Sequence, residues 1–411
     1  MKNFLFSIFT VIIVSVIISC SSTPRSVAPS YILPIIRINT DNAAPILDRE
    51  IWVPMTFSLT DHNNPSNNIS KIDNQQIRGR GNSTWSYEDG AKNPYRIRFR
   101  ENHPLFGLPA ARNWVLLKSG GALNNSIGFE LGQRLGLQYT CSFYHVELYL
   151  NDDYMGMYLF TEHRQADPSG LGAPGRPKVD LNEGWFIEID RYWDEDPKFR
   201  TTNYDLPIMI KTPEFYPLDI DNPAYNFVID NWSELTNLMS SSDFPENGYR
   251  DLIDIDTFVK YFIVQTIMMN KDLFRPGAED GLEIGSVFFY KDKDGKISAG
   301  PLWDLDWSLS ADAFEGREFS ANSFPYLIHP FFNRFFQDPV FSARYKEIWN
   351  ENFLIISEMP TFIDDLALKI RGGVIKDIDR WNSDRSFDWE IKELKNYYNA
   401  RITYLNEIYN K

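Results

Sequence analysis

The sequence predicts an α+β fold in two lobes, a β-rich lobe over residues 31–225 and a helical lobe over residues 226–411. In the first part, segments rich in β-forming residues alternate with polar loops. In the second part, apolar residues recur at helical spacing instead. With 43% hydrophobic residues over 411 positions, the chain has enough apolar side chains for a large core.

Strands are predicted where apolar and polar residues alternate. The clearest case is a hairpin, in which residues 145–150 and 155–160 flank the polar turn Asn151-Asp-Asp153. Two earlier segments, residues 31–39 and 52–59, are also rich in β-formers. A later hairpin is expected at residues 287–290 and 297–299.

Helices are predicted from apolar stripes. Leu123, Ile127 and Leu131 recur every four residues and indicate one helix among the strands of the first lobe. In the second lobe, Asp256 is the expected N-cap of an apolar helix that begins near Phe258. The region from about residue 325 to the end is expected to be helical as well.

The first thirty residues differ from the rest. Lys2 precedes an apolar run over residues 4–18, and Cys20 follows that run directly. This is the layout of a bacterial lipoprotein signal, with lipid attached at Cys20 and residues 21–30 as a tether rich in Ser and Pro. The run is short for a membrane span, although an ordinary N-terminal anchor is the alternative. We therefore expect an extracytoplasmic protein held by lipid at a bacterial membrane, in the outer membrane or at the cell surface.

The charge balance bears on the class of partner. The formal net charge is −15, with no long basic run. Nucleic acid and anionic lipid surfaces both favour clustered positive charge, so neither is an expected partner. Only two cysteines are present, which excludes a disulfide scaffold, and Cys141 is expected to be a small buried residue beside a strand.

Several common catalytic signatures are absent from the sequence. It contains no Walker-type phosphate loop and no Gly-x-Ser-x-Gly nucleophile elbow. Its five histidines are scattered, without the spacing of zinc ligands.

Three groups of motifs remain, and their order along the chain is informative. The first contains Gly79-Arg-Gly-Asn82 and the basic strand Tyr95-Arg-Ile-Arg98; the second is a helix leading into a hairpin; the third contains Asn270-Lys-Asp272 and Asp304-Leu-Asp306. The segments are residues 77–85, 92–99, 105–109 and 114–117; residues 126–137 and 146–162; and residues 270–272, 286–292 and 299–306. Together they resemble the CotH kinase family, named for a spore-coat protein kinase, over nearly the whole chain after the tether.

The resemblance implies an atypical, bilobal protein-kinase-like fold and ATP- and Mg²⁺-dependent phosphorylation of Ser or Thr in secreted, periplasmic or surface proteins. Asp272 takes the place of the catalytic carboxylate, and Asp304 and Asp306 that of the Mg²⁺ ligands. The nucleotide would meet the loop that contains Gly79, Gly81 and Asn82, because backbone N–H groups of such loops approach phosphates.

The basic strand supplies the remaining expected contacts. Arg96 and Arg98 lie on one face because side chains alternate along a strand, and one of them is expected to meet the phosphates. Glu130 lies beside the apolar stripe of its helix, where it is expected to pair with that arginine as a kinase helix glutamate pairs with the strand lysine. In this family the strand commonly ends in Ile-Lys, whereas this chain has Ile97-Arg98.

Other interpretations stay open at this stage. In the first, Arg98 and Glu130 form a purely structural ion pair. In the second, Asp304 and Asp306 are loop carboxylates that cap a helix near Trp307. The whole domain is a kinase-like binding module without turnover in a third. A fourth takes Asp304-Leu-Asp306 as the Asp-x-Asp motif of a nucleotide-sugar glycosyltransferase.

Overall fold

The computed structural model describes most of the chain after residue 30. The described residues are 31–88, 90–108, 110–118, 123–164, 184–215, 217–270, 273, 284–309, 321–322 and 329–410. Residues 31–411 form one compact unit, and the predicted signal and tether lie outside the described residues. Within the described part, no helix is both long enough and apolar enough to span a bilayer.

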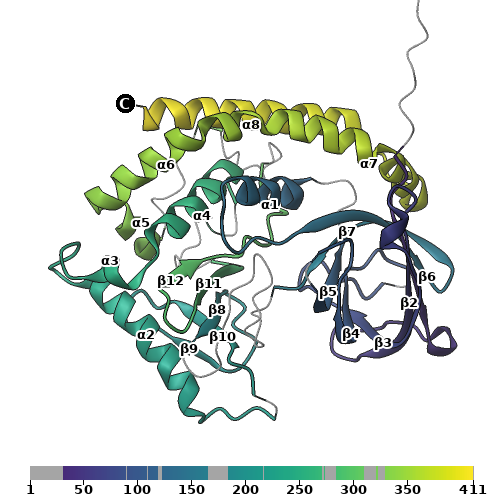
Figure 1. Cartoon of the computed structure of the whole chain (residues 1–411), viewed down its shortest axis with the longest axis horizontal. Helices are drawn as coiled ribbons and strands as arrows, with labels where there is room; N and C mark the ends of the chain where they lie inside the picture. Colours follow the sequence, from purple (N-terminus) through teal and green to yellow (C-terminus); the bar gives the residue numbers. More distant parts are fainter. Residues whose placement is uncertain are drawn as a thin grey trace, which may run out of the picture. The chain divides into compact units, whose positions relative to one another are not determined.

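A closed barrel of seven strands forms the N-terminal part of this unit (Figure 1), in the order β1-β2-β3-β4-β5-β7-β6. Its strands are β1 (Ile35–Thr40), β2 (Val53–Thr60), β3 (Ile69–Gly79), β4 (Tyr95–His103), β5 (Ala111–Leu117), β6 (Phe143–Leu150) and β7 (Asp153–Glu162), with short 3₁₀ turns η1 (Asp41–Ala43) and η2 (Pro65–Asn67). The barrel closes where β1 pairs in parallel with β6, while its other pairs are antiparallel.

A second sheet has five antiparallel strands in the order β12-β11-β8-β10-β9. The strands are β8 (Trp185–Ile189), β9 (Lys198–Arg200), β10 (Pro207–Thr212), β11 (Val287–Lys291) and β12 (Ile297–Ala299). Its central strand β8 is buried along its whole length. The sheet thus combines strands from both sides of the lobe boundary predicted at residue 225.

Helices surround this second sheet and extend to the barrel. They are α1 (Asn124–Arg134), α2 (Pro223–Ser240), α3 (Tyr249–Leu252), α4 (Ile255–Met268), α5 (Pro330–Phe335), α6 (Pro339–Ser357), α7 (Met359–Trp381) and α8 (Phe387–Tyr409). Helix α4 is buried over most of its length and packs against α1, α6 and α8. Helix α7 runs beside α8 and reaches the β7 side of the barrel (Figure 1).

The α+β prediction is confirmed, and so are the predicted strands and hairpins, which correspond to β1, β2, β6, β7, β11 and β12. The predicted helix near residue 123 is α1, and Cys141 is buried as expected. The predicted N-cap Asp256 is wrong. Asp254 caps α4 by accepting the N–H of Thr257, because the chain is already helical at Ile255, and Asp256 instead pairs with Arg344.

Candidate functional site

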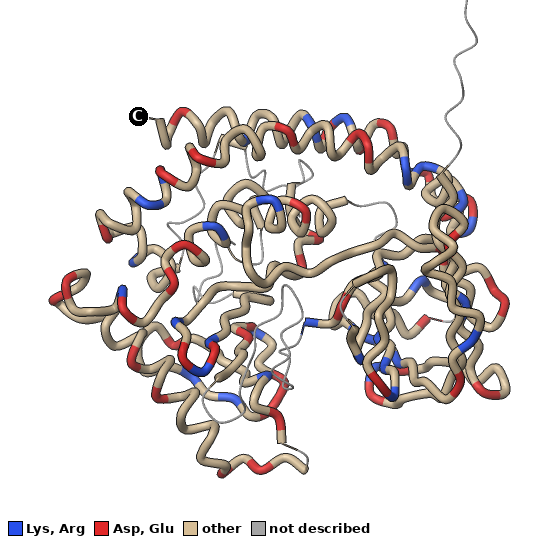
Figure 2. The backbone as a smooth tube through the Cα atoms, viewed as in Figure 1, with Lys and Arg blue, Asp and Glu red and all other residues tan. Residues whose placement is uncertain are grey.

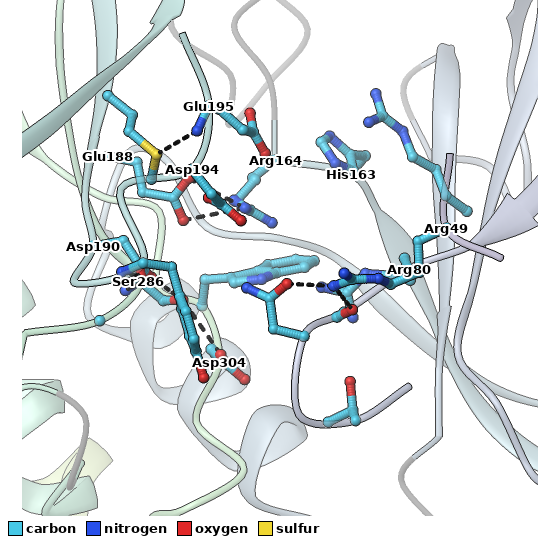
Figure 3. A pocket seen from close by; sticks show the side chains of 18 of the residues that line it. Arg49, Arg80, His163, Arg164, Glu188, Asp190, Asp194, Glu195, Ser286 and Asp304 are labelled. Carbon is cyan, nitrogen blue, oxygen red and sulfur yellow. Dashed lines mark hydrogen bonds and ion pairs between the residues drawn. The ribbon is translucent and has the colours of Figure 1, made fainter. Parts of the chain in front are cut away.

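A pocket of about 1150 Å³ opens between the barrel and the second sheet. Its barrel side is formed by the end of β3, the loop at residues 79–84 and β4. Its other side is formed by residues 188–195 at the end of β8, together with residues 285–286 and 303–307. Figure 3 shows Arg49, Arg80 and His163 facing Asp190, Ser286 and Asp304 across this space. Most of the residues predicted from the motifs lie here.

Arginine is concentrated in this pocket, although the protein as a whole is acidic. Figure 2 shows charges of both signs interspersed along the helices. The pocket is lined by Arg49, Arg78, Arg80, Arg96, Arg98, Arg112, Arg164 and Arg191. Its lining also contains carboxylates, most of them on the side opposite the barrel: Glu50, Glu188, Asp190, Asp194, Glu195, Glu214, Asp304 and Asp306. The guanidinium groups gathered on the barrel side indicate that this side of the pocket can bind an anionic group.

The loop after β3 has the tight geometry predicted for it. A side chain at Gly79 would collide with Trp85 and with the carbonyl of Asp48, and Gly81 has a φ of 85°, so both positions favour glycine. Arg49 Nη1 holds the loop by donating to the Gly81 carbonyl at 2.7 Å and to Asn82 Oδ1 at 2.5 Å. Asn82 therefore lines the pocket with its side-chain oxygen already bonded to Arg49.

Two arginines lie close to the carboxylates of the opposite side. Arg80 and Arg164 approach the ring of Trp303, at 5.9 and 5.4 Å from its centroid. Burial and the neighbouring Arg164 lower the pKa of Arg80 to about 10, while Asp304 and Asp306 act in the opposite direction. Arg80 is therefore the cation of the barrel side that interacts with both predicted metal ligands.

Arg96 and Arg98 lie on the same face of β4, as predicted, and both line the pocket. Arg98 stacks on Trp52 at 4.2 Å, and Arg96 lies 5.8 Å from the same ring. Burial, followed by the charges of Arg78 and Arg98, lowers the pKa of Arg96 to about 9. The Nε atoms of Arg78 and Arg96 are buried and have no hydrogen-bond partner among the described residues.

His163 follows β7 and lines the pocket between the arginines. Burial, with Arg96, Arg164 and Arg80 next in effect, holds its pKa well below the usual histidine value. The imidazole is therefore neutral at physiological pH, and its buried Nδ1 has no hydrogen-bond partner in the part of the chain that the structure describes.

On the opposite side, Ser286 connects two carboxylates. Its N–H donates to Asp190 Oδ2 at 2.8 Å, and its hydroxyl lies 3.3 Å from Asp304 Oδ2. Burial, with a contribution from Glu188, raises the pKa of Asp190 to about 6. Glu188 itself is buried and pairs with Arg164 at 3.1 Å and Lys211 at 3.0 Å.

Asp306 is held by the first turn of α1. Asn125, which is buried, donates to Asp306 Oδ1 at 2.5 Å and accepts the N–H of Leu305 at 2.8 Å. Protein atoms surround the Asp306 carboxylate, and Asp304 lies nearby, so its pKa is raised above the usual aspartate value. The residue nevertheless keeps surface open to solvent, because it faces the pocket. We therefore regard Asp306 as surrounded by protein but hydrated.

The structure does not bring Glu130 to Arg98. Glu130 accepts from Arg134 Nε at 2.7 Å, one helical turn further along α1, and lines a separate hollow with residues of α7. Asp272 and Cys20, predicted for catalysis and lipid attachment, lie outside the described residues.

Several residues of the pocket were not predicted from the sequence. Arg80 stands inside the Gly79-Arg-Gly81 motif, so its position was a usable signal. Arg164, Glu188 and Asp190 carry no local signal, because their contacts join segments far apart in the chain. Among the described residues, no group of three or more His, Cys, Asp or Glu side chains is arranged to hold a metal ion.

Comparison with known families agrees with this geometry. The profile described as CotH kinase protein matches residues 77–405. The chain belongs to the CotH kinase protein family. The match begins at the end of β3 and ends in α8, so it includes the glycine loop, the basic strand and the carboxylates opposite. CotH membership points to a kinase-related function. No curated protein sequence matches the chain.

Proposed function

We propose that this chain is a protein kinase that uses ATP and Mg²⁺ to phosphorylate Ser or Thr side chains of secreted or surface proteins. The observation that carries the proposal is the division of the pocket into a cationic barrel side and an opposite side that carries Asp304 and Asp306. Phosphoryl transfer depends mainly on positioning and on neutralising phosphate charge, and a pocket with this division can do both. The proposal includes a kinase-like arrangement in which the barrel acts as one lobe and the rest as the other.

The residues that line the pocket fit both Mg²⁺ and the phosphates of ATP. Mg²⁺ typically takes one or two protein carboxylates, and substrate phosphates and water complete its coordination. Asp304 and Asp306 match this pattern. Burial and then the charge of Asp304 raise the pKa of Asp306, and a bound cation would relieve the repulsion between the two carboxylates. On the barrel side, the loop at Gly81 and the guanidinium of Arg80 offer donors to phosphate oxygens.

Each side chain then has a defined task. Asp304 and Asp306 hold the cation, which neutralises phosphate charge when bound. Arg80 draws the phosphates toward these carboxylates, and Arg49 keeps the loop at Gly81 in place. Asp272, by its position in the family motif, is proposed to orient the acceptor hydroxyl and accept its proton.

Thermal unfolding with and without Mg-ATP tests this proposal. At a ligand concentration of 100 times Kd, binding adds about 2.7 kcal/mol to the free energy of unfolding, which raises Tm by several degrees. Asp304→Asn should remove the Mg²⁺-dependent rise and leave the Tm of the ligand-free protein equal or higher. Asp194→Asn, which changes a pocket carboxylate in the exposed loop after β8, is the matched control and should keep the rise.

Asp272→Asn separates binding from chemistry. It should keep the Mg-ATP shift and lose transfer of phosphate to protein, because the proposed task arises only at the acceptor hydroxyl. A wild-type protein that shows no shift with Mg-ATP contradicts the proposed nucleotide use. A shift with a sugar nucleotide instead would favour glycosyl transfer.

A second candidate function is a binding module without turnover. It is favoured by Glu130, which pairs with Arg134 rather than with a basic residue of β4, so a kinase-like ion pair between strand and helix is not formed there. This candidate predicts no Mg-ATP shift and no phosphate transfer, while ligand binding in the pocket persists.

We also propose that lipid at Cys20 anchors the protein to a bacterial membrane outside the cytoplasm. The support is the apolar run that precedes Cys20 in the sequence. Full-length protein expressed in bacteria should partition into the detergent phase, whereas Cys20→Ala should not. Wild-type protein that remains in the aqueous phase would contradict the anchor.

A further inference from the structure

Three arginines of the barrel that line the pocket surround one indole ring. The guanidinium carbons of Arg78, Arg96 and Arg98 lie 4.8, 5.8 and 4.2 Å from the centre of the Trp52 ring. Arg78 and Arg96 are direct partners in the β3–β4 register, where like charges opposite each other destabilise a sheet. We call these three residues and Trp52 the arginine cluster.

In the described protein, the charges of Arg78 and Arg96 are compensated only in part. Arg78 pairs with Glu50 at 3.2 Å, but the Glu50 side chain is 82% exposed, so water screens the pair. Arg96 reaches the Asn113 amide oxygen at 3.4 Å, a long hydrogen bond. The Nε atoms of Arg78 and Arg96 are buried and have no acceptor. Buried donors without acceptors are rare and call for an explanation, and here an anionic ligand supplies one.

The arginine cluster differs from the cations that face the carboxylates. The charge of Arg80 interacts with Asp304 and Asp306, the proposed cation ligands. Burial has the largest effect on Arg96, and the charges that act on it are those of Arg78, Arg98 and Arg164, followed by Glu195. The barrel side therefore has one cation beside the proposed nucleotide phosphates and a second group of cations with a different electrostatic environment. The pocket, at about 1150 Å³, is somewhat larger than the usual range for one small ligand.

We propose that the arginine cluster binds an acidic segment of the acceptor polypeptide, a run that contains Asp or Glu next to the Ser or Thr to be phosphorylated. This inference rests on the proposed function and names its substrate class. It also changes the expected role of Arg96 and Arg98, which would bind the acceptor polypeptide and not the nucleotide phosphates. Arginine suits this task because its planar group binds a carboxylate through two parallel hydrogen bonds while one face stacks on an aromatic ring.

Binding of labelled peptides to the full mature domain, without nucleotide, tests the arginine cluster directly. The probes are a fluorescein-labelled peptide of alternating Ser and Glu and a matched peptide of alternating Ser and Gln, followed by fluorescence anisotropy. The Ser-Glu peptide should bind at least about tenfold more tightly, and the preference should weaken as salt is raised. Equal affinity for the two peptides would overturn the inference.

Variants then locate the binding. Arg78→Gln combined with Arg98→Gln should reduce the preference for the Ser-Glu peptide by about tenfold or more and keep the Mg-ATP rise in Tm. Arg37→Gln is the matched control, since Arg37 also stacks on a barrel ring, that of Tyr149 at 4.1 Å, but does not line the pocket. If the double variant loses the Mg-ATP rise, the cluster serves the nucleotide and the inference fails.

A competition experiment on the wild-type protein needs no variant. Mg-ATP at saturating concentration should leave the Ser-Glu peptide bound, whereas displacement of the peptide by Mg-ATP would show a shared subsite and overturn the inference. The failure of the proposed function gives a different result. In that case Mg-ATP produces no rise in Tm, while the preference for the Ser-Glu peptide persists and identifies the cluster as a docking surface for acidic polypeptides.

Discussion

On the barrel side of the pocket, three of the arginines, Arg78, Arg96 and Arg98, come from neighbouring positions of two paired strands, β3 and β4. On the opposite side, the carboxylates come from segments far apart in the chain, with Asp190 and Ser286 separated by 96 residues. The placement of these three arginines depends on the strand register. The opposite side depends on side-chain hydrogen bonds, above all those from Asn125 of α1, that hold a loop in place. A substitution should therefore have different consequences on the two sides.

The two sides are joined away from the pocket by helix α7. Asp377 on this helix is buried and accepts from Lys92 Nζ at 2.5 Å and from the N–H of Met157 at 2.8 Å. Lys92 precedes β4, the strand that carries Arg96 and Arg98, and Met157 is in β7. This pair therefore connects the arginine side of the barrel to the C-terminal helices.

The largest expected effect is at this connection. Asp377→Ala should lower the free energy of unfolding by about 3–5 kcal/mol, because it leaves a buried lysine without its partner. Chemical denaturation measures the change. Asp379→Ala, on the exposed face of the same helix, is the control and should change stability by less than about 0.5 kcal/mol. A loss at Asp377 no larger than at Asp379 would show that the connection does not stabilise the fold.

The next effect is on the carboxylate side. Asn125→Ala should lower the free energy of unfolding by about 2–3 kcal/mol, since it removes the acceptor of the Leu305 N–H and a donor to Asp306. It should also weaken the Mg-ATP rise in Tm, because Asp306 loses its anchor. Gln133→Ala is the control, for this amide of α1 bonds only to the Cys141 carbonyl. An unchanged Mg-ATP rise in Asn125→Ala would contradict the anchoring role.

This contrast explains what the sequence could predict. Alternation placed Arg96 and Arg98 on one face of a strand, and glycine chemistry identified the loop at Gly79 and Gly81, because both are local properties. The motif also placed Asp304 and Asp306 in the site. It did not reveal that Arg80 would face them, since that contact depends on how the barrel lies against the second sheet.

The sequence did not predict two other kinds of feature: which of several possible partners a side chain binds, and how the barrel closes. The helical period placed Glu130 correctly on α1 but could not choose its partner, and Arg134, one turn away, is nearer than any residue of β4. The parallel pairing of β1 with β6, which closes the barrel, joins strands about a hundred residues apart and leaves no local pattern. Asp190 was missed for the same reason, because its contact with Ser286 is long-range.

A third prediction concerns acid at the junction of α1 and the barrel. His145 of β6 is buried, its Nε2 lies 3.0 Å from the Ser126 hydroxyl of α1, and burial lowers its pKa to about 4. The unfolded chain takes up this proton near pH 6.5, whereas the folded protein does so only near pH 4. The stability that depends on neutral His145 is therefore complete above about pH 6.5 and falls as the pH drops toward 4.

The loss from this one group should reach about 2 kcal/mol at pH 5 relative to pH 7.5. His145→Gln should remove that part of the pH dependence, because glutamine keeps an amide near Ser126 and does not titrate in this range. Denaturant unfolding at pH 5 and at pH 7.5 gives the two free energies. His62→Gln, at an exposed histidine, is the control and should unfold with the wild-type pH dependence. If His145→Gln shows the same pH dependence of the free energy of unfolding as the wild type, His145 is not the source of that dependence.

The smallest effect is expected on the outer face of α7, where Arg371 pairs with Asp388 of α8 at 2.5 Å. Both side chains are well exposed, at 48% and 71%, so water solvates each charge when the pair is broken. Arg371→Ala should therefore change the free energy of unfolding by less than about 1 kcal/mol, and the change should shrink further at high salt. Asp377 lies on the same helix and also pairs with a cation, Lys92, at 2.5 Å. The Arg371–Asp388 and Lys92–Asp377 pairs therefore have the same length and differ in burial. If Arg371→Ala were as costly as Asp377→Ala, burial would not be the reason that α7 stabilises the barrel.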